Sequence, residues 1–97
     1  MFQIGFDGPG KVIAQGRLDA AQAPHAQEFL DAVNEQCVID LGGLEYISSA
    51  GLGVLLRTHK RLMAGGGGLK LVNVNSHIND IFMYSGFDRL FEIEATE

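Results

Sequence analysis

Two adjacent serines, Ser48 and Ser49, are the residues of this sequence best placed for chemistry. They follow the apolar stretch Val38–Leu41 and a glycine-containing turn, and they directly precede Ala50–Gly53, where a helix is expected to begin. The first turn of a helix offers unpaired backbone N–H groups and partial positive charge. A serine at such a position can cap the helix, act as a nucleophile, bind an anion or carry a phosphate.

The residues around the serines argue against a nucleophile. The nucleophile elbow of α/β-hydrolases has a glycine two residues before and two residues after the serine. Gly51 supplies the second glycine for Ser49, but Ile47 stands where the first would be. The chain of 97 residues is also too short to supply the acid and base of an α/β-hydrolase. We therefore predict no catalytic residue here and no enzymatic activity.

Helix capping explains one serine but not two. An N-cap serine accepts a backbone N–H and contributes about 1 kcal/mol. The following residues, Ala50–Gly53, are small and flexible, although glycine inside a helix costs about 1 kcal/mol relative to alanine. Such residues leave the start of the helix open for another surface or an anion, so the pattern favours an exposed recognition site over a cap alone.

A phosphate on one of these serines would have a direct physical effect on binding. It adds a charge of about −1.5 to −2, which the donor-rich start of a helix tolerates. A partner docked over the same spot would face that charge, and leaving a charge buried and unpaired costs about 2–5 kcal/mol. One serine could then control binding without any catalytic residue.

The remaining motifs do not predict a cofactor or metal site. Gly65–Gly68 follow a predicted helix and precede a predicted strand, which reverses the order of a P-loop and indicates a flexible turn. His25, His59 and His77 lack metal-ligand spacing. The single cysteine, Cys37, begins an apolar run and is expected to be a buried thiol. We predict no cofactor and no metal.

Composition narrows the class of protein. The sequence is 46% apolar and 20% charged, which suits one small domain with one core. A formal net charge of −5 gives no basic surface, so nucleic-acid binding is not expected. One cysteine suits a reducing compartment, and no segment resembles a targeting sequence or a transmembrane span. We predict a cytoplasmic protein without direct membrane insertion.

Strands and helices are predicted to alternate around the serines. Apolar periodicity predicts strands at 2–6, 11–18, 37–41 and 69–74, with 91–93 as a candidate final edge strand. It predicts helices from about 21–23 to 34, from about 49–51 to 64 and at 78–85. Ser76 is the expected N-cap of the third helix. Cys37–Leu41 is nearly all apolar, which is typical of a central strand covered on both faces. The order β-β-α-β-α-β-α predicts one α/β domain over residues 1–97, with a mixed, mostly parallel sheet and helices packed on it.

Five segments, taken in order, carry a resemblance to a known family: Gly16–Asp19, Val38–Leu41, Tyr46–Leu56, Gly68–Val74 and Ile81–Phe91. The series resembles the STAS domain, specifically the small stand-alone bacterial anti-anti-sigma factors, also called anti-sigma factor antagonists. Each segment alone would be a weak signal, whereas their order over nearly the whole chain is specific.

In that family the helix begins with Asp-Ser-Ser/Thr-Gly-Leu-Gly, and the first serine after the aspartate is phosphorylated. Aligned on Gly51–Gly53, the resemblance implies that Ser49 is the phosphorylated residue, with Ser48 as the second choice. Ser48 stands where the family has aspartate, and Ala50 stands where it has a second hydroxyl residue. The partner-binding residues that the resemblance implies are Asp19, Ser48, Ala50, Gly51, Leu52 and Gly53.

The resemblance further implies a partner-switching cycle. The unphosphorylated protein would bind an anti-sigma factor, an ATP-binding serine kinase with a histidine-kinase-like fold, and so release a sigma factor. Phosphorylation of Ser49 would dissociate the complex, and a serine phosphatase would reset it. ATP and metal would belong to those partners, and this chain is expected to be a monomer. The alternative is an accessory subunit of a lipid or anion transport assembly, since STAS-like domains also attach to transporters.

Overall fold

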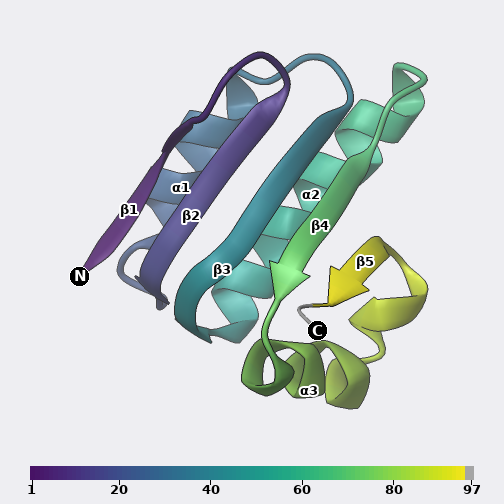
Figure 1. Ribbon diagram of the computed structural model, residues 1–97. Coiled ribbons are helices and arrows are strands. Elements are labelled where there is room, and N and C mark those ends of the chain that lie inside the picture. Colours follow the sequence, from purple (N-terminus) through teal and green to yellow (C-terminus); the bar gives the residue numbers. More distant parts are fainter. Residues whose placement is uncertain (96–97) are drawn as a thin grey trace.

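Strands and helices alternate along residues 1–95, which are the residues that the computed structural model describes (Figure 1). The strands are β1 (Phe2–Phe6), β2 (Lys11–Leu18), β3 (Cys37–Ile47), β4 (Leu69–Val74) and β5 (Glu92–Ala95); the helices are α1 (Ala23–Asp31), α2 (Ser49–Ala64), α3 (Ser76–Ser85) and the 3-10 helix η1 (Phe87–Arg89). The predicted α/β fold is confirmed, including the final strand. The predicted domain end at residue 97 lies outside the described residues.

The sheet has the strand order β1-β2-β3-β4-β5. β1 and β2 form the expected antiparallel hairpin, in which Phe2 is opposite Gly16 and Phe6 is opposite Val12. The other neighbouring strands are parallel. Parallel neighbours require crossover connections, which α1, α2 and the segment of α3 and η1 supply. The carboxyl ends of β2, β3 and β4 therefore lie along one edge of the sheet.

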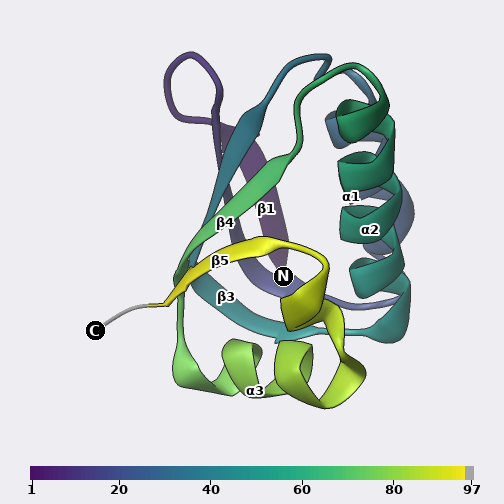
Figure 2. The same cartoon turned by 90° about the vertical axis from the view of Figure 1, so that its right-hand side faces the viewer.

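Helices α1 and α2 cover one face of the sheet, and α3 lies beneath its lower edge (Figure 2). The core between the layers includes Ile39, Leu71 and Val54, which are fully buried. Burying a side chain of this size contributes about 1.5–3 kcal/mol. This packing holds the first turns of α2 against the sheet. Along the described chain, no helix is long and apolar enough to cross a membrane.

β3 is the central strand of the sheet, as expected, but the expectations that it is short and covered on both faces were wrong. Its residues alternate, so that Cys37, Ile39 and Leu41 are buried while Val38 and Asp40 are half-buried. Helices α1 and α2 lie on the same side of the sheet in Figure 2. The face on which the half-buried residues of β3 lie therefore has neither helix over it within residues 1–95. β3 also continues through the predicted turn after Leu41, because the second half of β2 pairs with it as far as Ile47.

Smaller boundaries also differ from the sequence prediction. β5 spans Glu92–Ala95 rather than 91–93, and α3 begins at Ser76 rather than at residue 78. α1 begins at Ala23 as expected, with Pro24 in its first turn, but ends at Asp31 rather than at residue 34. The N-cap of α3 is Asn75 and not Ser76, since the Asn75 Oδ1 atom accepts the backbone N–H of Ile78 over 2.9 Å. Asparagine and serine are equally good caps, so residue type alone could not distinguish these neighbours.

Candidate functional site

Three polar residues directly follow the carboxyl ends of neighbouring strands: Asp19 after β2, Ser48 after β3 and Asn75 after β4. A side-chain oxygen of each accepts the backbone N–H of the residue three positions further on, over distances of 2.9–3.1 Å. The carboxyl ends of parallel strands are where open α/β sheets place their ligand sites. We call this row of residues the carboxyl edge and treat it as the candidate functional site.

The two serines occupy different positions at the carboxyl edge. Ser48 is the N-cap of α2, with extended backbone (φ −87°, ψ 170°), and its Oγ accepts the N–H of Gly51 over 3.1 Å. Its own N–H donates to the carbonyl of Leu18 over 2.9 Å, which ties the cap to β2. Ser49 is the first residue of α2 and its side chain is exposed. The cap is thus Ser48, and Ser49 is exposed at the surface.

Gly51 and Leu52 are buried, which does not fit their expected role as partner-contact residues. A Cβ atom on Gly51 would lie 2.8 Å from the Leu18 Cγ atom and 2.9 Å from the Ile47 Cγ1 atom. Leu52 is 6% exposed and belongs to the core. Both residues therefore bring α2 close to the ends of β2 and β3. The small residue at position 51 serves this internal packing rather than the approach of another surface.

Ser49 also lines a shallow cleft between the first turns of α1 and α2. The lining residues are Ala20, Ala23, Pro24, Gln27, Ser49, Ala50, Gly53 and Arg57. Arg57 spans this cleft, and its Nε atom donates to the Gln27 Oε1 atom over 3.1 Å. One turn further on, Arg61 donates to the carbonyls of Leu30 and Val33, each over 2.8 Å. Two arginines of α2 thus fix the position of α1 beside Ser49.

Asn75, Gln27 and Arg57 are site residues that the sequence analysis did not identify. Asn75 also donates through Nδ2 to the carbonyl of Leu44 over 3.0 Å, which joins the α3 cap to β3. Arg57 could have been found from its spacing, because Ser49, Gly53 and Arg57 follow one another at intervals of four residues. Nothing in the sequence marks Gln27 as its partner.

The contacts of the cysteine and of one histidine indicate a role in packing rather than in chemistry. Cys37 is buried as expected, and desolvation by burial raises the pKa of its thiol. The His59 Nδ1 atom accepts the backbone N–H of Leu69 over 2.9 Å, and its ring packs against that of Phe91. Within residues 1–95, no three His, Cys, Asp or Glu side chains are grouped so that they could hold a metal ion.

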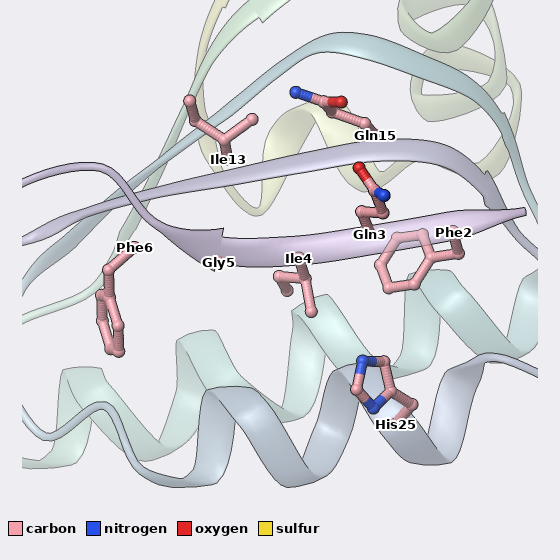
Figure 3. A pocket seen from close by; sticks show the side chains of 8 residues that line it. All are labelled: Phe2, Gln3, Ile4, Gly5, Phe6, Ile13, Gln15 and His25. Atoms are coloured by element: carbon pink, nitrogen blue, oxygen red, sulfur yellow. The ribbon is translucent and has the colours of Figure 1, made fainter.

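A larger hollow lies along the free edge of β1, and neither Ser48 nor Ser49 lines it (Figure 3). Phe2, Ile4 and Phe6 point from β1 toward the helix that carries His25, whereas Gln3 and Gln15 point to the opposite side of the sheet (Figure 3). The hollow thus wraps around the edge of β1, and the side chains that line it do not point toward one reactive group. Its lining includes no pairing of a nucleophile with a base, so it does not compete with the carboxyl edge as a candidate site.

Comparisons with known proteins agree with this fold. Residues 6–97 match the STAS domain. The chain is 38% identical over 90 residues to BtrV of Bordetella bronchiseptica, a provisionally assigned anti-sigma factor antagonist, covering 87% of this chain and 78% of that protein. It is 34% identical over 83 residues to the anti-sigma-B factor antagonist of Bacillus subtilis, covering 82% of this chain and 76% of that protein.

Solved structures with the same fold include the anti-sigma factor antagonist SpoIIAA. Its unphosphorylated form gives a TM-score of 0.76 at 20% identity, covering 100% of this chain and 89% of that one. Its phosphorylated form, described as a Bacillus cell fate determinant, gives a TM-score of 0.72 at 20% identity, covering 100% and 92%. The chain belongs to the STAS domain family.

Proposed function

We propose that this chain is an anti-sigma factor antagonist that acts by partner switching as one STAS domain over residues 1–97. Its unphosphorylated form binds an anti-sigma factor that is also an ATP-binding serine kinase, and this binding releases a sigma factor. Phosphorylation of Ser49 ends the interaction. The curated relatives BtrV and the B. subtilis protein support the general role through their names.

The observation that carries the proposal is that Ser48 caps α2 while the adjacent Ser49 is exposed. Because Ser48 caps α2, its hydroxyl is engaged by Gly51. Ser49 is exposed in the first helical turn, where backbone N–H groups and the helix dipole favour an anion. A phosphoryl group can therefore be added at Ser49 without removing the cap or displacing the core.

The partner surface that we propose consists of the accessible residues around Ser49. Asp19, Ser48, Ala50 and Gly53 are all half-buried and lie beside it in the sequence or along the carboxyl edge. A docked partner would cover the phosphoryl group, and an unpaired buried charge costs about 2–5 kcal/mol. At 1.4 kcal/mol per tenfold change, phosphorylation should weaken binding roughly 30- to 4,000-fold.

The chemistry of the switch belongs to the partners. The kinase transfers the γ-phosphoryl group of ATP to the Ser49 Oγ atom, so that the O–P bond to ADP breaks, a new O–P bond forms and the hydroxyl proton is released. A serine phosphatase restores the hydroxyl by hydrolysis. This chain supplies the acceptor and the docking surface, and we propose that it works in the cytoplasm.

Phosphate mapping with the kinase from the same genome tests the proposal. Incubation with the kinase and ATP should add one phosphate, which peptide mass spectrometry should locate at Ser49. Ser49→Ala should abolish the modification, while the matched variant Ser48→Ala should still be modified. Phosphate found only on Ser48, or no phosphate with any serine kinase of that genome, would refute the assignment.

A further inference from the structure

Arg57 lies two helical turns after Ser49 on the surface of α2. Residues four apart are neighbours on a helix, so Ser49, Gly53 and Arg57 form one row with about 6 Å of rise per step. Long helical side chains point toward the helix N-terminus, which directs Arg57 back along this row. A Cβ atom on Gly53 would lie only 3.2 Å from the Arg57 Nη1 atom. The guanidinium group therefore already lies over Gly53, halfway to Ser49.

A hydrogen bond to α1 favours this position of the guanidinium group. Gln27 of α1 accepts a hydrogen bond from the Arg57 Nε atom over 3.1 Å. Gln27 is itself oriented by Asp31, whose Oδ1 atom accepts from the Gln27 Nε2 atom over 2.8 Å. The absence of a side chain at Gly53 leaves room for the guanidinium against the helix. A Cβ atom on Gly53 would lie 3.2 Å from Nη1 and 4.0 Å from Nη2, and Arg57 lines the same cleft as Ser49.

The charge of the cleft also favours an anion. Its lining within the described chain has one formally charged residue, Arg57, and no carboxylate. This local positive charge contrasts with the formal net charge of −5 of the whole chain. Arginine binds phosphate oxygens through two parallel N–H donors at about 2.7–2.9 Å, with roughly twice the strength of neutral hydrogen bonds.

We propose that Arg57 is the intramolecular counter-ion of the phosphoryl group on Ser49. The inference rests on the proposed function for the identity of the modified residue, and it adds that the phosphorylated chain holds its own phosphate. Arg57 moves from Gly53 toward the first turn of α2, and the phosphoryl group extends the serine side chain toward it. The phosphate then lies along the α1–α2 cleft rather than free in solvent, so a partner must break an ion pair before it can dock.

The test uses a chain that carries phosphoserine at position 49, incorporated during translation so that no kinase is needed. A nearby guanidinium favours the dianion, so it lowers the second pKa of the phosphate, which is ordinarily near 6. We expect Arg57→Gln to raise this pKa by about 0.3–0.7 units in a phosphorus NMR titration, and Arg57→Lys to restore part of the difference. Asp19, at the carboxyl edge, is present in every variant, so its charge affects all of them alike.

Lys60→Gln is the matched control. It removes the same charge from the same helix but lies about 16 Å along the axis from Ser49, beyond the Debye length at physiological salt. Equal phosphate pKa values in Arg57→Gln and Lys60→Gln would overturn the proposal, whatever residue the kinase modifies. A kinase that phosphorylates another residue would instead refute the proposed function, so the two failures are distinguishable.

Discussion

The hydroxyl of Ser48 accepts the backbone N–H of Gly51 over 3.1 Å, and this bond separates the roles of two adjacent serines. Ser48 becomes part of the helix terminus, whereas Ser49 is left at the surface. The family resemblance places aspartate where this chain has Ser48. Aspartate and serine are both strong N-caps, so the replacement preserves the cap and removes one negative charge beside Ser49.

The stability of the two serine variants should differ. Ser48→Ala loses the cap and should lower the free energy of unfolding by about 1 kcal/mol. Ser48→Asp keeps an acceptor at the helix N-terminus and should be at least as stable as the native chain. Ser49→Ala should change stability by less than about 0.5 kcal/mol because its side chain is exposed. Urea denaturation measures all three, and equal losses for Ser48→Ala and Ser49→Ala would contradict this assignment.

Two glycines of α2 should respond to alanine in opposite directions. Gly51→Ala places a Cβ atom 3.0 Å or less from Leu18 and Ile47 atoms, including the Leu18 carbonyl oxygen, and should cost about 1–3 kcal/mol. Gly53→Ala meets only the movable end of Arg57 and gains up to about 1 kcal/mol from helix propensity. Thermal unfolding of the pair checks this. A stabilising Gly51→Ala would show that α2 does not need its close approach to β2.

A charge at Ser49 should weaken partner binding. Ser49→Asp should reduce affinity for the anti-sigma factor about 30-fold, at the lower end of the expected penalty, since its carboxylate carries less charge than a phosphate. Ser49→Ala should bind normally but should not dissociate when ATP is added. Calorimetric titration measures both. Gln36→Glu is the control, because it adds the same charge at an exposed position before β3, at the opposite edge of the sheet. An equal loss of affinity in this variant would show that net charge alone, and not its position, weakens binding.

The thiol of Cys37 should be unreactive in the folded chain. Burial raises its pKa above the ordinary value of 9.0, so the folded state favours the protonated thiol. This contribution to stability is present below pH 9.0 and is lost as the pH rises through the folded-state pKa. Relative to Cys37→Ala, the native chain should therefore lose stability in alkaline solution. Disulfide-exchange labelling of Cys37 at pH 8 should be no faster than unfolding of the chain. Rapid labelling of the folded chain would contradict the expected low reactivity of the thiol.

Local patterns along the chain determined most of the element order. The alternation in Phe2–Phe6 and the helical spacing after Ser49 depend on neighbouring residues, and periodicity reports them correctly. The burial of Cys37 also followed from its place at the start of an apolar run. Where competing local signals were similar, the prediction failed, as at the cap of α3, where Asn75 and not Ser76 receives the backbone N–H.

The sequence by itself determined that a pair of serines lies between a strand and a helix, at a position where an exposed site is expected. Only the tertiary structure decided which serine is the cap, why Gly51 must be small and where Arg57 points. These features depend on Leu18 and Gln27, which lie about thirty residues away in the chain and contact α2 only after β2, α1 and β3 have packed together. Local periodicity carries no information about such contacts. They depend on how separate strands and helices pack against one another, whereas periodicity describes only the spacing of residues within one strand or helix.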